Sequence, residues 1–224
     1  MTVRILDYTK NPLNRIGEIA GICYSSDTTN SVKNISRAKE CIASGHKSVC
    51  EFADVTMVIS NRSIRLLREI MRARVGVSFV QQSTRYVNLD DFEYFTPNSI
   101  KKLDLANGIY AEAMEEIKDA YKSLIEIGVP QEDVANILPL GSNTTVIMKI
   151  NLTALQNLMN NRLCTRAYHE ARQLMNEIKT ELSKLDDEWK YICDNLLQPK
   201  CIINGRCTEK NCCGLIDRIN NKGE

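Results

Sequence analysis

Residues 72–86 form a dense group of polar side chains, and this segment constrains most strongly how the chain can fold. It contains three arginines, two serines and two glutamines, and apolar runs flank it on both sides. Arginine side chains bind phosphate or carboxylate groups through two-point contacts, while hydroxyl and amide groups can recognise a planar heterocycle. The pattern places the segment across the end of a helix and the turn after it. A cluster of this kind is hard to explain as ordinary surface, so it is a candidate binding site.

Length and charge narrow the class of protein. With 224 residues, of which 43% are hydrophobic and 25% charged, the chain suits one sizeable domain with a tail. Its net charge of +1 gives no overall attraction to nucleic acid or to an anionic membrane, so any anion site must be local. No apolar run approaches the roughly 20 residues that span a bilayer, and the first residues are too polar for a signal peptide. We therefore expect a cytoplasmic protein without nucleic-acid or membrane partners.

The spacing of apolar residues predicts strands and helices along the whole chain. The expected strands are Val3–Tyr8, Phe52–Ser60, Thr84–Leu89 and Thr144–Ile150. The expected helices are Pro12–Cys23, Asn34–Ala43, Asn61–Arg74 with Asn61 as N-cap, Asp104–Ile127, a short helix before Leu138, Leu152–Arg162 and Ala167–Leu185.

Arg162 lies on the apolar stripe of its expected helix, where a charged side chain is unusual. One interpretation is that its long side chain passes the edge of the core and reaches water. The alternative is a partly buried arginine held by an anionic or polarised ligand, since burying it unpaired costs several kcal/mol.

The segment Ser78–Tyr86 resembles the signature of flavin-dependent thymidylate synthases. That signature reads Arg-His-Arg, seven residues and then Ser, and it usually continues to Arg-Tyr. In this chain Ala73 stands where the family has His, and one extra residue lies between Arg74 and Ser78.

Other stretches resemble the same family in the same order along the chain. They are Cys23-Tyr24-Ser25, Gly45-His46-Lys47-Ser48 with Glu51, Leu138-Pro139-Leu140 followed by Asn151, Asn157 and Arg162, then Cys164 with Arg166–Glu170, and the tail Cys201–Cys213. The resemblance implies an α+β fold in which long helices pack around a mixed β-sheet. It also implies a single domain over residues 1–197, followed by a cysteine-rich tail over residues 198–224.

The resemblance further implies roles for individual residues. Those matching flavin-binding positions are Arg72, Arg74, Gln81, Asn151 and Asn157. Those matching positions that hold dUMP are Gln81, Ser83, Thr84, Arg85 and Arg162. Arg162 corresponds to the arginine placed against the uracil ring, where a fixed positive charge makes the C5 carbon nucleophilic. Arg162 and Ser83 are thus the candidate catalytic residues. Ser83 is expected to hold the ligand, because no histidine or lysine is spaced to activate it as a nucleophile.

The implied reaction is the FAD-dependent reductive methylation of dUMP to dTMP, with methylenetetrahydrofolate and NADPH as co-substrates. The resemblance also implies a homotetramer with shared active sites, in which the basic stripe Arg65, Arg68 and Arg72 could face a neighbouring subunit. Two alternatives stay open. The chain could act on another pyrimidine nucleotide, or it could bind nucleotide or flavin without turnover.

Several positions depart from the family pattern. Phe52 replaces a histidine, Glu69 replaces a glutamine, and Ala135 and Thr153 replace arginines. Each loss removes a donor or a positive charge, at a cost of about 1–3 kcal/mol in ligand binding. Arg65, Arg68 or Lys149 could compensate from nearby.

The remaining histidines and cysteines favour structural interpretations. We expect His46 to be a turn residue and His169 to be packed within a helix. The tail cysteines Cys201, Cys207, Cys212 and Cys213 lack the paired CxxC spacing of zinc sites. We therefore expect no metal, and free thiols or a disulfide in its place.

Overall fold

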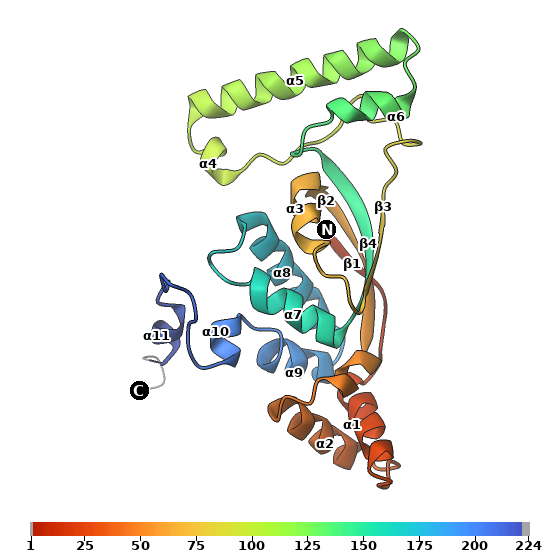
Figure 1. The fold of residues 1–224 in the computed structure, drawn as a ribbon, viewed down its shortest axis with the longest axis vertical. Coiled ribbons are helices and arrows are strands. Elements are labelled where there is room, and N and C mark those ends of the chain that lie inside the picture. The colour runs from red at the N-terminus through yellow and green to blue at the C-terminus, as the bar shows by residue number, and fades with distance from the viewer. Residues whose placement is uncertain (1, 221–224) are drawn as a thin grey trace. The chain divides into compact units, whose positions relative to one another are not determined.

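The protein is described by a computed structural model that covers residues 2–220, with side chains as far as residue 218 (Figure 1). The strands are β1 Val3–Tyr8, β2 Asp54–Ser63, β3 Val77–Gln81 and β4 Asn143–Asn151. The helices are α1 Pro12–Cys23, α2 Ser31–Ala43, η1 Ser48–Phe52, α3 Ile64–Ile70, α4 Asn98–Lys101, α5 Asp104–Glu126, α6 Gln131–Val134, η2 Ala135–Ile137, α7 Leu152–Arg162, α8 His169–Leu182, α9 Asp187–Asn195, α10 Lys200–Ile203 and α11 Leu215–Asn220. None of the described helices is long and apolar enough to cross a bilayer.

The four strands form one sheet in the order β1-β2-β4-β3. The register of β1 and β2 is reversed, because Thr9 N–H donates to the Asp54 carbonyl at 3.0 Å and Ser60 N–H donates to the Thr2 carbonyl at 2.8 Å. The backbone bonds between β2 and β4 and between β3 and β4 show the same reversal. The α+β class is therefore confirmed, and the strands pair antiparallel where mixed directions were expected.

Alternating burial explains why β2 and β4 form where the sequence predicts them. Val55, Met57 and Ile59 of β2 are fully buried, while the residues between them are partly exposed. Val146 and Met148 of β4 alternate in the same way. Because successive side chains of a strand point to opposite faces, this pattern buries one face of each strand.

The chain folds into two compact units, each assembled from separate stretches of sequence. Among the described residues, unit 1 comprises residue 2 with residues 58–71 and 79–147, and unit 2 comprises residues 3–57, 72–78 and 148–220. The strands β2, β3 and β4 contribute residues to both units. The single domain expected over residues 1–197 and the separate tail after it stay predictions.

Unit 1 contains the longest helix, α5, which packs against the short helices α4 and α6. The Lys118 ammonium group links α5 to the loop that contains Asp91. Its Nζ lies 2.9 Å from Asp91 and 3.1 Å from Glu115, which is also in α5. It also lies over the rings of Phe92 and Tyr94. The hydrogen bond to Asp91, and then that to Glu115, raise the pKa of Lys118.

Unit 2 contains most of the large buried side chains. The helix α1 packs closely on α2, and a Cβ on Gly17 would lie only 1.8 Å from the Asn34 carbonyl oxygen. The helix α8 packs against β1 and α9. Trp189 of α9 is fully buried, and its indole N–H donates to the Thr9 carbonyl at 3.0 Å. The helix α9 was not predicted, and Asp186 caps it by accepting from Trp189 N–H at 2.7 Å.

Two predicted elements are wrong around the candidate segment. The helix expected over residues 61–74 is shorter, because the Ser63 hydroxyl caps it by accepting from Leu66 N–H at 3.0 Å. Asn61 lies in β2 with a φ of 54° and is not the cap. The strand expected over residues 84–89 is a turn, and the strand β3 lies earlier, at Val77–Gln81.

Candidate functional site

The turn between α3 and β3 carries two of the predicted arginines in unit 2. Arg72 and Arg74 are both exposed, and within residues 2–220 Arg74 forms no ion pair. Gly76 follows in the left-handed region with a φ of 72°, a conformation that glycine adopts without strain. The turn thus presents an uncompensated guanidinium beside a backbone that bends sharply.

Asn151 joins this turn to the start of α7. Its backbone N–H donates to the Gly76 carbonyl at 2.8 Å, and its side-chain oxygen caps α7 by accepting from Ala154 N–H at 2.9 Å. The carboxamide lies so close to Gly76 that a Cβ there would approach its nitrogen to 2.4 Å. Asn151 therefore has a structural role that the sequence analysis did not foresee, and its contact with flavin stays a prediction.

The helix α7 carries the other two predicted residues of unit 2. Asn157 is exposed in the middle of the helix, with the buried Gln156 and Leu158 on either side. Arg162 is half-buried in the last helical turn, and it interacts with other groups of the protein. Both interpretations of Arg162 therefore stay open, and its role toward a ligand stays a prediction.

The remaining predicted residues belong to unit 1. They lie at the end of β3 and in the turn that follows it. Gln81 is exposed at the last position of the strand. Ser83 then closes a tight turn, because its hydroxyl accepts from Arg85 N–H at 3.2 Å. This side-chain hydrogen bond replaces strand pairing and explains why the segment turns.

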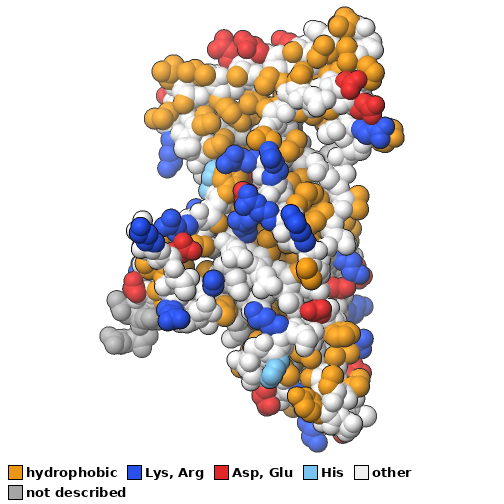
Figure 2. All heavy atoms as spheres, in the orientation of Figure 1, with side chains coloured by type: hydrophobic (Ala, Val, Ile, Leu, Met, Phe, Trp, Pro, Cys, Tyr) orange, Lys and Arg blue, Asp and Glu red, His pale blue; other side chains and the backbone are white. Residues whose placement is uncertain are grey.

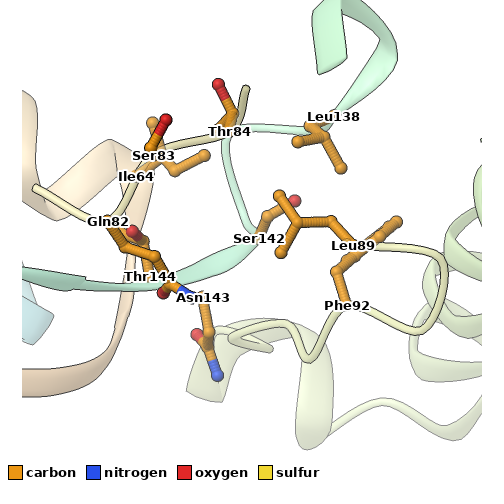
Figure 3. A pocket seen from close by; sticks show the side chains of 10 residues that line it. All are labelled: Ile64, Gln82, Ser83, Thr84, Leu89, Phe92, Leu138, Ser142, Asn143 and Thr144. Carbon is orange, nitrogen blue, oxygen red and sulfur yellow. The ribbon is translucent and has the colours of Figure 1, made fainter. Parts of the chain in front are cut away.

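A pocket in unit 1 brings Ser83 and Thr84 together with the start of β4 (Figure 3). Ser142 is only 2% exposed, and its hydroxyl has no hydrogen-bond partner within residues 2–220. The carbonyl oxygen of the Asn143 side chain is likewise buried without a partner there. Buried polar atoms normally find partners, so these two atoms are candidates for a ligand or a water.

Ser142 and Asn143 were not among the predicted site residues. The signal that could have found them is their position immediately after the Leu138–Gly141 turn, just before the predicted strand Thr144–Ile150, in which apolar residues alternate from Val146. Polar side chains at the end of a buried strand often face a site, but the sequence does not show that their neighbours leave them unpaired.

Arg85 is held by an acidic side chain from α6. Its Nε lies 2.7 Å from a carboxylate oxygen of Glu132, and the two side chains are 62% and 53% exposed. The guanidinium also lies over the ring of Tyr86, at 5.5 Å from the centroid. An anionic ligand at Arg85 would have to displace Glu132 or share the arginine with it.

Two side chains that depart from the family pattern, Phe52 and Thr153, have environments that need no ligand. Phe52 is 56% exposed. The Thr153 hydroxyl donates to the Lys47 carbonyl at 2.8 Å, which fastens α7 to the segment before η1. Lys149 lies 3.3 Å from Asp54, so its charge is already paired on the sheet. Lys149 is therefore a weaker candidate for compensation than the sequence suggested.

The predicted residues thus fall into two groups. Arg72, Arg74, Asn151, Asn157 and Arg162 belong to unit 2, where Gly76 and Asn151 connect the arginine turn to α7. Gln81, Ser83, Thr84 and Arg85 belong to unit 1, where Ser83 and Thr84 line the pocket.

Comparison with known proteins supports the resemblance. A family model described as thymidylate synthase complementing protein matches residues 4–186. The flavin-dependent thymidylate synthase of Pyrococcus furiosus is 34% identical, over 93% of this chain and 90% of the relative. That of Clostridium tetani is 31% identical, over 92% of this chain and 90% of the relative. That of Geobacter sulfurreducens is 30% identical, over 80% of each chain.

Proposed function

Because this chain belongs to the flavin-dependent thymidylate synthase family, we propose that it catalyses the FAD-dependent reductive methylation of dUMP to dTMP. The observation that carries the proposal is the family match over residues 4–186, and two groups of polar residues in the structure support it. One group joins exposed arginines to the start of α7, and the other places the hydroxyl groups of Ser83 and Thr84 at a pocket, with Arg85 next in the sequence. The first group suits the diphosphate of a flavin. The hydroxyl groups and Arg85 suit contacts with the edge of a nucleotide, since the pocket itself, at about 10 Å³, has room for one water.

The residues of unit 2 fit a flavin. Arg74 offers a guanidinium that no described carboxylate neutralises, and such a group suits the diphosphate of FAD. Gly76 lets the turn bend sharply, and the Asn151 side chain fills the space beside its α-carbon. We assign Arg72, Arg74, Asn151 and Asn157 to flavin binding, together with Gln81 from unit 1. When bound, the flavin supplies the hydride that completes the methyl group.

The residues of unit 1 fit the nucleotide. Ser83 and Thr84 offer hydroxyl groups and Arg85 offers a guanidinium, a combination that suits a phosphate and the polar edge of a pyrimidine. Ser142 adds a buried hydroxyl that needs a partner. Gln81 is assigned to the nucleotide as well as to the flavin. In this assignment Ser83 positions dUMP and does not become covalently attached.

Arg162 is the residue we assign to the chemical step. A guanidinium held against the uracil ring stabilises negative charge on the ring and thereby favours attack by its C5 carbon. A half-buried arginine suits this task because its field is screened less than at an open surface.

Methylenetetrahydrofolate as methyl donor and NADPH as reductant complete the proposed reaction, and we propose a cytoplasmic location. We also propose that the chain assembles as a homotetramer. The helix α5 supports this, because apolar side chains lie along it in Figure 2 and only two of its side chains, Met114 and Tyr121, are buried. Leu105 is 79% exposed and Ile109 is 61% exposed. An apolar helix surface of this kind favours association with further copies.

The deciding experiment is tritium release from 5-³H-dUMP by the purified protein. We expect the purified protein to be yellow, and we expect release to require both NADPH and methylenetetrahydrofolate. A yellow protein that releases no tritium but converts another pyrimidine nucleotide would support the alternative substrate. A protein that binds flavin or dUMP but turns over no pyrimidine nucleotide would support the non-catalytic alternative. Light scattering would test the tetramer, which Ile109→Lys on α5 should weaken.

A further inference from the structure

The turn after β3, which we call the nucleotide turn (residues 83–87), carries three of the side chains assigned to dUMP. Ser83 and Thr84 are adjacent on it, and Arg85 follows (Figure 3). Two hydrogen bonds shape the turn from within. Arg85 N–H donates to the Ser83 hydroxyl at 3.2 Å, and Val87 N–H donates to the Ser83 carbonyl at 3.2 Å. Both bonds end on Ser83, so they leave the carbonyl groups of the later residues to other partners.

Gln131, the first residue of α6, binds two of these carbonyl groups. Its Nε2 donates to the Thr84 carbonyl at 3.4 Å and also to the Val87 carbonyl. A carboxamide nitrogen carries two N–H groups, so one side chain can serve both acceptors. Within residues 2–220, no backbone N–H donates to either carbonyl. Gln131 therefore supplies the hydrogen bonds that a neighbouring strand would supply in a sheet.

The packing of α6 fixes the position of Gln131. Val134 of the same helix is only 1% exposed, and α6 packs against α5. The Pro130 carbonyl accepts from Asp133 N–H at 2.9 Å and from Val134 N–H at 3.1 Å, which closes the helical turn that begins at Gln131. The Gln131 side chain is itself partly buried. The nucleotide turn is thus held by a side chain whose own backbone is already fixed.

Glu132, the next residue of α6, contacts the same turn in a different way. It pairs with the Arg85 guanidinium, so it competes for a group that an anionic ligand also needs. The Gln131 carboxamide binds backbone carbonyls, and an anionic ligand does not compete for these acceptors. Gln131 can therefore hold the turn in the free protein and in the complex with nucleotide.

We propose that Gln131 is a positioning residue for the nucleotide, because it holds the turn that carries Ser83, Thr84 and Arg85 in one conformation. The inference rests on the proposed function, since it assigns Gln131 to the same nucleotide site. A segment that is ordered before binding loses less conformational entropy when the ligand binds. Loss of the carboxamide should therefore weaken dUMP binding, while the chemical step assigned to Arg162 should persist.

Gln131→Met tests the contact itself, because methionine has a similar size but neither N–H donors nor charge. Hydrogen exchange of the full-length protein, followed by mass spectrometry, reports the opening of the turn through the amides of Arg85 and Val87. Exchange in peptides that cover residues 83–89 should become about five- to tenfold faster, since it follows the population of the opened segment. Gln131→Glu keeps the shape but sets oxygen against the two carbonyls, and it should speed exchange at least as much.

Asn136→Leu is the matched control. The Asn136 carboxamide donates to the Glu132 carbonyl at 3.4 Å and to the Asp133 carbonyl at 3.0 Å, both of which belong to α6. This variant removes a carboxamide from the same segment and leaves the contacts of the nucleotide turn in place. It should change neither the exchange of the turn nor the affinity for dUMP. Equal effects of Asn136→Leu and Gln131→Met would overturn the proposal, because α6 as a whole would then support the turn.

Titration calorimetry and steady-state kinetics measure the consequence for the nucleotide. In Gln131→Met the dissociation constant and the KM for dUMP should both rise about tenfold. Turnover at saturating dUMP should stay within about twofold of the parent, and flavin absorbance should be unchanged. Unchanged exchange of the turn, or unchanged affinity for dUMP, would overturn the role of Gln131. A parent protein that binds no dUMP would instead overturn the proposed function, while faster exchange in Gln131→Met would still show that the side chain holds the turn.

Discussion

The side chain of Asn151 lies directly against the α-carbon of Gly76, with the carboxamide nitrogen 2.4 Å from where a Cβ would stand. This contact joins the turn that carries Arg72 and Arg74 to the N-cap of α7. The two residues are also linked by a backbone hydrogen bond of 2.8 Å. A change at either residue should therefore affect both the arginine turn and the helix that carries Arg162.

Gly76→Ala should destabilise the protein by about 2–4 kcal/mol, because alanine is strained in the left-handed region and its methyl group would displace Asn151. Urea unfolding measures this loss. Gly45→Ala is the matched control, since Gly45 has a φ of 76° and nothing within 4 Å of a Cβ. The control should lose only about 1 kcal/mol. Equal losses in the two variants would contradict the close contact with Asn151.

Arg162→Ala should lower turnover of dUMP by about 100-fold or more, because it removes the positive charge assigned to the uracil ring. Flavin binding should stay largely intact, as judged by the absorbance of the purified protein. Arg15→Ala is a suitable control, because Arg15 pairs with Glu18 at the surface of α1 and has no assigned ligand. If Arg162→Ala formed dTMP at near the parental rate, the assigned role would be wrong.

Ser83→Ala should weaken dUMP binding by about tenfold, because a hydrogen bond to a charged ligand is lost. Turnover at saturating dUMP should persist. Titration calorimetry measures the first effect and steady-state kinetics the second. Ser183→Ala serves as control, since that hydroxyl only donates to the Thr180 carbonyl at the end of α8. Unaltered dUMP affinity with complete loss of turnover would instead indicate a covalent serine.

Glu132→Gln should strengthen dUMP binding, because it frees the Arg85 guanidinium from its carboxylate partner. An exposed ion pair contributes about 0–1 kcal/mol, so the dissociation constant should fall by up to about fivefold. The neighbouring Asp133→Asn changes the net charge equally without touching the pair, and it separates the local effect from the general one. A dissociation constant that rises in Glu132→Gln would show that Glu132 positions Arg85 for the ligand.

Cys193 should make stability sensitive to alkaline pH. Burial raises its pKa from the usual 9.0 to about 12. The unfolded chain therefore releases this proton at lower pH than the folded protein. The stabilising effect is complete below about pH 9.0 and is lost as pH rises toward 12. Urea midpoints measured across this range should fall less steeply in Cys193→Ala than in the parent.

Cys213→Ala is the control for the alkaline experiment. A hydrogen bond from Thr165 is the main cause that lowers the pKa of Cys213, so its removal should leave the alkaline fall in stability in place. An unchanged slope in Cys193→Ala would show that other groups, such as Cys50 with its pKa raised by burial to about 11, dominate the pH dependence.

Local sequence signals located most elements correctly. The bounds of β1, α1 and α7 match the predictions, because apolar periodicity and Pro12 mark them within a few residues. The prediction that Asn61 caps the helix near this position was wrong. Asn61 and Ser63 are both residue types that cap helices well, and only the fold shows that Asn61 still belongs to β2. The turn after β3 was wrongly predicted as a strand. In the structure, Arg85 N–H donates to the Ser83 hydroxyl, and this local hydrogen bond competes with strand pairing.

The sequence by itself determined the family, the α+β class and the residue types available for binding, because these follow from motifs and from periods of two and 3.6 residues. Only the tertiary structure decided which side chains meet. It set Asn151 against Gly76, Glu132 on Arg85 and the unpaired Ser142 hydroxyl in a pocket. Such contacts join residues far apart in the chain or depend on the path of a turn, so no local pattern encodes them.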